Sequence, residues 1–231
     1  MPMSELIQRL EAAGVPLDDL TKFAMEDVDP AVFTDFDLDP FWDDRPVPFL
    51  FTGFGATRTI SAPHMIATLL HNLEIIEGQD IMLIGSKGGY LAAIIDRMVG
   101  KDGSVTIIEP HEEVREYTEE RLSIHQSSGM IRVLRPHDME SSDESSRSFG
   151  RILITGSVRE IPETIEHMVV DGDDICDAKD DDDNDGPLAN QDKGTQPGWD
   201  NALPGFTGVI STLALLGAAI GVGLSGRRKN D

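Results

Sequence analysis

This 231-residue chain has few basic residues for its acidic content, a single cysteine, and no apolar run at its N-terminus. Only 19 Lys and Arg stand against 42 Asp and Glu, which gives a formal net charge of -23. Because nucleic-acid phosphates bind basic surfaces, this balance argues against a nucleic-acid partner. The single cysteine, Cys176, excludes an intramolecular disulfide. Residues 1–14 are charged and amphipathic, so we expect no secretory signal peptide.

Residues 81–90, IMLIGSKGGY, form the first stretch with a functional pattern. Four apolar residues run into a glycine cluster, and an apolar helix pattern follows in residues 91–95. This order predicts a buried parallel strand, a tight turn, and a helix N-terminus that favours a polar or anionic ligand. Tight packing of a strand on a helix would produce the same pattern without a ligand. The Lys-Ser/Thr pair of a phosphate-binding P-loop is missing, so that interpretation fails.

Strand and helix patterns alternate through residues 1–170. We expect an ordered loop over 27–48, and a helix within 57–73 that begins near Pro63 with Ser61 as its N-cap. The other expected helices lie at 4–14, 17–25, 112–122 and 161–170, and the other strands at 104–108, 131–134 and 151–155, with a polar loop at 141–148. Alternation at this spacing predicts an α/β fold with a doubly wound, mostly parallel sheet.

Two acidic residues follow strands that should end at the same sheet edge as the glycine turn. Glu109 ends the second strand, roughly 20 residues after the glycines, where a carboxylate can accept hydrogen bonds from a ribose. Asp138 follows the third strand and could contact an adenine amino group. Either acid alone could equally be a loop residue facing water, but two at one edge favour a nucleotide-containing ligand.

From about residue 6 to residue 170 the chain resembles the protein-L-isoaspartate O-methyltransferase family, which are class I S-adenosylmethionine-dependent methyltransferases. The strongest match is TISAPHM at 59–65, and the segments 84–93, 105–109, 23–33 and 154–165 are also similar. The resemblance implies a Rossmann-like methyltransferase fold. It also implies methyl transfer from S-adenosylmethionine to the free carboxyl of L-isoaspartyl residues in damaged proteins, the first step of their repair.

The resemblance also assigns roles to individual residues. Ser61 matches the active-site serine, and His64 stands beside it in the same motif, so these are the candidate catalytic residues. The implied cofactor-binding residues are Gly85, Ser86, Gly88, Gly89, Glu109 and Asp138. Because the sulfonium is already activated, a serine hydroxyl that orients the carboxylate is sufficient without a general base. A plain helix cap at Ser61 and a structural role for His64 are the alternatives.

The chain departs from the family pattern in three places. Leu83 stands where an acidic residue is expected, Lys87 and Gly88 replace Gly-Ser/Thr, and Pro30 replaces an arginine. Lys87 either points away from the sulfonium or meets the methionine carboxylate. After residue 170 the family continues into a further strand pair, whereas this chain becomes acidic, so we expect a sheet that lacks its last strand pair and exposes an edge. A degenerate, non-catalytic cofactor- or protein-binding module on a membrane stalk is therefore the alternative function.

We divide the chain into a methyltransferase-like domain over 1–170, of which 1–56 is a helical and loop part, an acidic disordered linker over 171–203, and a membrane segment over 204–231. Within the linker, Asp181, Asp183, Asp185 and Asp192 have the spacing of the start of a calcium loop. The run is also similar to Asp-rich calcium repeats of the thrombospondin type 3 sort. A solvated charge run is the alternative.

Residues 206–224 carry no charge and are long enough to form one transmembrane helix, and Arg227, Arg228 and Lys229 follow them. With PGF at 204–206, this tail resembles the C-terminal sorting signal of archaeal surface proteins. Basic residues after the span favour an exterior domain, whereas S-adenosylmethionine is a cytoplasmic cofactor. We expect a membrane-associated protein whose domain is cytoplasmic, with an exterior domain as the alternative.

Overall fold

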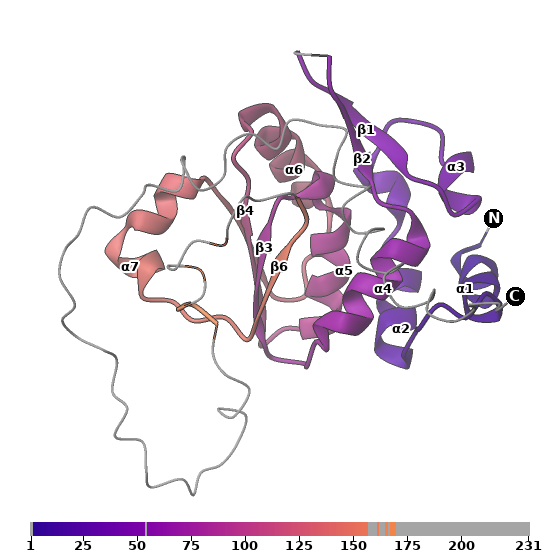
Figure 1. The fold of residues 1–231 in the computed structure, drawn as a ribbon, viewed down its shortest axis with the longest axis horizontal. Coiled ribbons are helices and arrows are strands. Elements are labelled where there is room, and N and C mark those ends of the chain that lie inside the picture. The colour runs from indigo at the N-terminus through magenta and orange to yellow at the C-terminus, as the bar shows by residue number, and fades with distance from the viewer. Residues whose placement is uncertain (1, 54, 157–160, 162–164, 166, 170–231) are drawn as a thin grey trace, which may run out of the picture.

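The structure is a computed structural model that describes residues 2–53, 55–156, 161, 165 and 167–169 (Figure 1). The predicted linker and membrane segment lie outside the described residues, and so do residues 162–164, 166 and 170 of the helix expected at 161–170. Within the part that is described, no helix is both long and apolar enough to cross a bilayer.

The centre of the fold is a four-stranded parallel sheet. Its strands are β3 (Asp80–Ile84), β4 (Ser104–Ile108), β5 (Met130–Leu134) and β6 (Arg151–Ile154), in the order β5-β4-β3-β6. The chain moves outward from β3 to β4 and β5, and then returns to place β6 on the other side of β3. Strand order therefore reverses beside β3, which is where ligands bind in doubly wound sheets. The predicted α/β class, the parallel sheet and its four strands are confirmed.

Both faces of the sheet are covered, as continuous apolar strands require. Ile81 and Leu83 of β3 point into the larger apolar core, whereas Met82 and Ile84 point into a smaller one that contains Met139, Phe149, Ile165 and Met168. Along β3 the side chains thus alternate between the two cores, as the period of two along a strand dictates. Leu83 stands at the position where the family pattern has an acidic residue, and its side chain is fully buried in the larger core.

Helices that precede and helices that follow the glycine turn in the sequence build the larger core. Figure 1 shows α5 (Tyr90–Val99) against the sheet, with α4 (Pro63–Leu73), α2 (Asp19–Asp27) and α1 (Met3–Ala12) farther out. The helix α6 (Glu112–Ile124) connects β4 to β5. The expected helices at 4–14, 17–25 and 112–122 are confirmed within a few residues.

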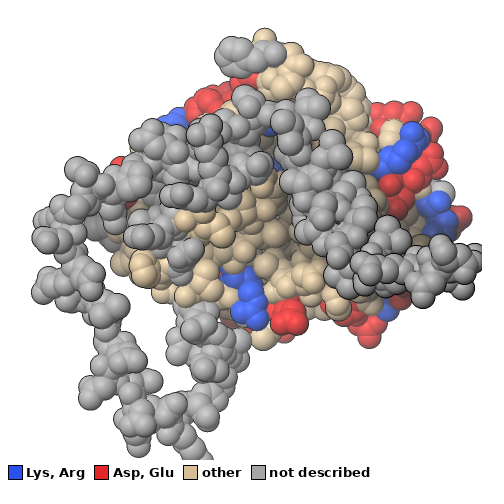
Figure 2. Space-filling model, viewed as in Figure 1, with Lys and Arg blue, Asp and Glu red and all other residues tan. Residues whose placement is uncertain are grey.

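Figure 2 shows charged side chains gathered at the margin of this view and mainly uncharged surface near its centre.

The sequence interpretation missed an antiparallel hairpin before α4. Its strands are β1 (Val47–Phe51) and β2 (Thr57–Ile60), and their register shifts between Pro48 and Leu50. Pro48 and the short length of β2 hide the period of two, so the sequence predicts a loop over 27–48 and, within 57–73, only the helix that begins near Pro63. That loop also contains η1 (Pro30–Phe33) and α3 (Asp39–Trp42).

Two further predictions about polar segments are corrected. The helix α4 does begin at Pro63, but its N-cap is Ala62 and no side chain at that position caps it, so Ser61 is not the cap. The segment expected to be a polar loop contains α7 (Ser142–Ser145), because Ser141 accepts a hydrogen bond from the Glu144 N–H at 3.4 Å. Between β5 and α7 lies η3 (Pro136–Glu140).

Candidate functional site

The glycine turn joins β3 to α5 through backbone conformations that favour glycine. Gly85, Gly88 and Gly89 have φ angles of 92°, 75° and 95°, and the short η2 (Lys87–Gly89) lies between strand and helix. A Cβ atom on Gly88 would approach the Phe49 ring to 2.9 Å, so β1 packs directly on the turn. The turn is therefore a fixed, tightly packed backbone at the end of β3.

Glu109, the acid at the end of β4, is buried against this turn and only 4% exposed. Its Oε2 accepts hydrogen bonds from the Ser86 N–H at 2.9 Å and the Ser86 hydroxyl at 2.8 Å, and its Oε1 accepts one from the His111 N–H at 3.0 Å. An ionised carboxylate has about four acceptor positions, of which three are thus occupied. The structure confirms that Glu109 lies beside the glycine turn, and leaves one acceptor position for a ligand.

Thr118 of α6 extends this network in a way that the sequence did not indicate. Its hydroxyl oxygen lies 2.8 Å from Ser86 Oγ and 2.7 Å from the carbonyl oxygen of Val114. The Thr118 side chain is fully buried, and its single proton serves one of these two acceptors. The turn is consequently held by β4 and by α6 at the same point, Ser86.

Asp138, the predicted adenine contact, bonds to its own turn. Its Oδ2 accepts a hydrogen bond from the Arg135 N–H at 2.8 Å, and His137 Nε2 lies 3.2 Å from Oδ1. The side chain of Asp138 remains 39% exposed. The structure brings it to the carboxyl end of β5, beyond Glu109 in the strand order, and its contact with adenine stays a prediction.

A charged cluster that sequence reasoning missed lies at the same end of β5. Arg115 and Arg135 both bind the Glu112 carboxylate, with an Nη2–Oε1 distance of 2.8 Å in each case. Hydrogen bonds from Arg115 and then Arg135 lower the pKa of Glu112 to about 2. Because Glu112 and Arg115 are three residues apart on a helix, the sequence could have indicated that part of the cluster.

The TISAPHM segment lies next to the glycine turn because β2 packs against η2. Ser61 follows β2 directly and is half-buried, and its hydroxyl has no hydrogen-bond partner among the described residues. A polar hydroxyl in this position is available to a ligand. Its catalytic role stays a prediction.

His64 is held by an acid that no sequence motif indicated. Asp44 Oδ1 accepts a hydrogen bond from the His64 N–H at 2.8 Å, and Asp44 Oδ2 lies 2.9 Å from His64 Nδ1. Asp44 has a φ of 58°, a left-handed conformation that Asp tolerates better than most residues. Asp44 thus satisfies the first turn of α4 in place of Ser61, and it fixes the imidazole orientation.

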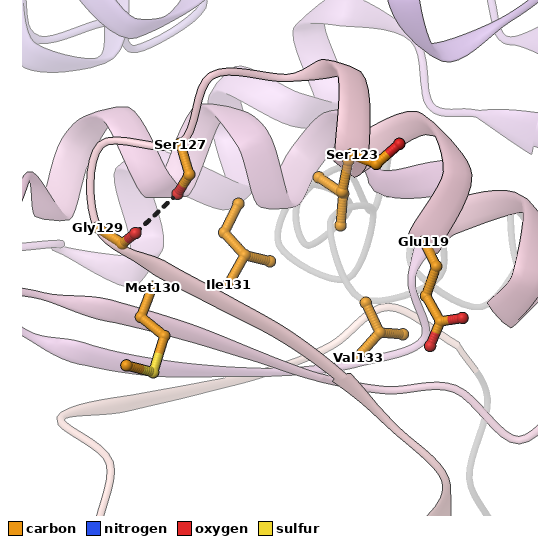
Figure 3. A pocket seen from close by; sticks show the side chains of 8 residues that line it. Glu119, Ser123, Ser127, Gly129, Met130, Ile131 and Val133 are labelled. Atoms are coloured by element: carbon orange, nitrogen blue, oxygen red, sulfur yellow. Dashed lines mark hydrogen bonds between the residues drawn. The ribbon is translucent and has the colours of Figure 1, made fainter.

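One hollow among the described residues lies away from the glycine turn. It has a volume of about 510 Å³ and lies between α6 and the edge strand β5 (Figure 3). The residues that line it are Glu119, Leu122, Ser123, Ser127, Gly129, Met130, Ile131 and Val133. None of the predicted site residues is among them, so we base the site on the strand ends and the glycine turn.

The predicted calcium ligands Asp181, Asp183, Asp185 and Asp192 lie outside the described residues. Among the residues that are described, no three His, Cys, Asp or Glu side chains are grouped to hold a metal ion.

Comparisons with known proteins agree with this geometry. The family model of protein-L-isoaspartate(D-aspartate) O-methyltransferase matches residues 1–176. A protein-L-isoaspartate O-methyltransferase of Methanococcoides burtonii is 31% identical over 166 residues, which cover 71% of this chain and 77% of that protein. The corresponding protein of Ignicoccus hospitalis is 29% identical over 162 residues, 70% of this chain and 74% of its own length.

Solved structures show the same fold. A protein-L-isoaspartate O-methyltransferase superposes with a TM-score of 0.63 and 22% identity, over 74% of this chain and 53% of that one. A Plasmodium falciparum protein assigned to the same enzyme, solved in complex with S-adenosyl-L-homocysteine, superposes with a TM-score of 0.61 and 22% identity, over 74% of this chain and 81% of that one. These likenesses establish a Rossmann-like methyltransferase fold.

Proposed function

Because this chain belongs to the protein-L-isoaspartate(D-aspartate) O-methyltransferase family, we propose that it methylates the free carboxyl of L-isoaspartyl residues in damaged proteins, with S-adenosylmethionine as methyl donor. The observation that supports this most is the contact between η2 and β2, the strand that Ser61 of TISAPHM directly follows. The reaction would begin the repair of these proteins.

The residues at the turn fit such a cofactor. Glu109 retains one acceptor position after its three internal hydrogen bonds, which suits a ribose hydroxyl. Gly85, Ser86, Gly88 and Gly89 would hold the cofactor beside the turn, and Asp138 at the end of β5 would take its adenine side. When bound, the cofactor supplies an activated methyl group on a sulfonium.

The chain's own residues then have to position the substrate. We assign to Ser61 the task of donating a hydrogen bond to the substrate carboxyl, because its hydroxyl has no described partner. His64 would act beside it, with its ring fixed through Nδ1 by Asp44 and its Nε2 left for the substrate. No proton has to be removed from a carboxylate before it attacks, so orientation and exclusion of water are the main requirements.

Methyl transfer to paired peptides tests this function. The full chain is incubated with S-adenosylmethionine and either an L-isoaspartyl peptide or the aspartyl peptide of the same sequence, and methyl ester is measured. We expect methylation of the isoaspartyl peptide alone. Ser61→Ala should reduce the rate by about tenfold to a hundredfold, the value of a hydrogen bond to a charged group, whereas Ser123→Ala on the surface of α6 should not.

The alternative function has a distinct outcome. A chain that binds S-adenosyl-L-homocysteine but methylates no isoaspartyl peptide would be a degenerate binding module, as the departures at Leu83 and Lys87 suggest. A chain that does neither would contradict both functions.

We propose further that residues 204–231 form a membrane segment joined to the domain by residues 171–203. The support is the uncharged run 206–224 followed by three basic residues. Membrane fractionation of the full chain, compared with a chain that ends at residue 203, tests this, and protease protection tells on which side the domain lies. We expect a cytoplasmic domain, and full protection from externally added protease in intact cells would agree.

Calcium binding by Asp181, Asp183, Asp185 and Asp192 stays a prediction, which calorimetric titration of the full chain with calcium tests.

A further inference from the structure

Two basic residues on packed elements beside the glycine turn have no acidic partner among the described residues. Arg58 lies on β2 and Lys87 in η2, and both are half-buried. Neither makes a hydrogen bond or an ion pair with any described residue, and the Arg58 Nε atom is buried with its donor unused. The elements that carry them, β2 and η2, pack against each other.

This arrangement is unusual in so acidic a chain. Most described arginines bind a carboxylate, as Arg97 does with Asp27 at 2.6 Å and Arg135 with Glu112 at 2.8 Å. Half-buried cations are costly unless they are paired, and two of them side by side also repel each other. Such a pair gains most from an anion that binds between or beside both groups.

The neighbouring acid, Glu109, is not an ion-pair partner of either cation among the described contacts. Burial is the main cause that lowers the pKa of Lys87, and Arg58 lowers it further, while Glu109 acts in the opposite direction. The Glu109 carboxylate accepts its hydrogen bonds from Ser86 and His111. The donors of both cations therefore stay unused by any described residue.

The backbone also indicates that a lysine at this position is functional. Lys87 has a φ of 50°, in the left-handed region that favours glycine, and its neighbours Gly88 and Gly89 occupy the same region. A long basic side chain is held there despite an unfavourable backbone conformation. Strain of this kind at the edge of a ligand site points to a role in binding.

We propose that Arg58 and Lys87 form a carboxylate-binding site beside the glycine turn. The assignment rests on the proposed function, which supplies two carboxylates: that of the amino-acid part of the cofactor, and the isoaspartyl carboxyl of the substrate. A bound carboxylate would also shield the cationic sulfonium from the two basic groups.

Binding measurements on the full chain separate the two sources. S-adenosyl-L-homocysteine carries the amino-acid carboxylate, and 5′-methylthioadenosine has the same nucleoside without it. If the site takes the cofactor carboxylate, Lys87→Gln and Arg58→Gln each raise the Kd of S-adenosyl-L-homocysteine about tenfold and leave that of methylthioadenosine unchanged. If it takes the substrate carboxylate, the Kd stays unchanged and the KM of the isoaspartyl peptide rises about tenfold.

Controls distinguish charge from folding. Lys87→Arg should retain the affinity that Lys87→Gln loses, and Lys101→Gln, an exposed lysine in the turn before β4, should change neither constant. The site is overturned if both Gln variants keep both constants at the wild-type value, or if they weaken the two nucleosides equally. A wild-type chain that binds no S-adenosyl-L-homocysteine and methylates no peptide would overturn the proposed function, and this site with it.

Discussion

The carboxylate of Glu109 closes the glycine turn by accepting both the N–H and the hydroxyl of Ser86, at 2.9 and 2.8 Å. The two residues are far apart in sequence and meet because β3 and β4 are paired in parallel, with Ile84 opposite Ile108. Glu109 is therefore a structural part of the turn as well as a candidate ligand for the cofactor.

Glu109→Gln should destabilise the fold and weaken cofactor binding together. The new amide group would turn N–H donors toward Ser86 or His111, leaving buried donors without an acceptor. We expect the free energy of unfolding to fall by about 1–3 kcal/mol, measured by urea denaturation. Glu116→Gln, on the exposed face of α6, is the matched control and should change neither property. A free energy of unfolding unchanged in Glu109→Gln would contradict a stabilising role of Glu109 at the glycine turn.

Asp44→Ala should lower stability because it removes the acceptor for the first turn of α4. Loss of such a cap costs about 1 kcal/mol. Asp43→Ala removes a neighbouring acid that pairs only with Arg45 at the surface, at 3.0 Å, and should cost less. Thermal unfolding of the two variants compares them directly. Equal decreases in melting temperature would contradict the capping role of Asp44.

Gly88→Ala should be worse tolerated than Gly78→Ala. The φ angles are similar, 75° and 85°, so the left-handed backbone penalises both by about 1–2 kcal/mol. Only at Gly88 would the added Cβ also meet a ring, that of Phe49, at 2.9 Å. The difference in free energy of unfolding between the two variants measures this contact. Equal values would mean that Phe49 of β1 moves aside at no measurable cost.

Lys87→Gly should make the protein more stable and a poorer binder of carboxylate. Glycine adopts the φ of 50° at this position without steric cost, which should raise the free energy of unfolding by about 1 kcal/mol. Lys87→Gln keeps the backbone cost and relieves only the cost of the unpaired charge, so it should gain less stability than Lys87→Gly. Denaturation curves of both variants test this, and a loss of stability in Lys87→Gly would refute it.

Asp96 should make stability depend on acid pH. Burial alone would raise its pKa, but hydrogen bonds from His125, Ser128, Ser127 and Gly129 outweigh burial and hold the pKa below its usual 3.8. The folded pKa is thus below the unfolded one, so the stabilisation is fully present above pH 3.8 and is lost as the pH falls through the folded pKa.

The variant Asp96→Asn tests this dependence. At neutral pH it should lose about 1–3 kcal/mol of stability, because the amide turns a donor toward the N–H group of either Ser128 or Gly129. As the pH drops below 3.8, the melting temperatures of wild type and variant should converge. Asp102→Asn in an exposed turn is the control, and parallel curves at all pH values would contradict the prediction.

Much of the fold could be predicted from local patterns. The apolar runs at β3, β4, β5 and β6 are short and bounded by turn residues, and a parallel sheet buries such runs on both faces. Glu109 could be predicted at the site because a residue that directly ends a parallel strand must lie at the carboxyl edge. The hairpin of β1 and β2 could not, because Pro48 and a register shift interrupt its period.

Neighbours along the chain fix the alternation of strands and helices, the glycine turn, and the residues at the strand ends. Only the packing of the whole chain fixes which of these residues touch. It turns Glu109 toward Ser86, gives the helix-capping role to Asp44 rather than Ser61, and brings the strand that carries Arg58 against the turn that carries Lys87. Such contacts join residues far apart in sequence, and their energies depend on burial and direction, which only the packed chain fixes.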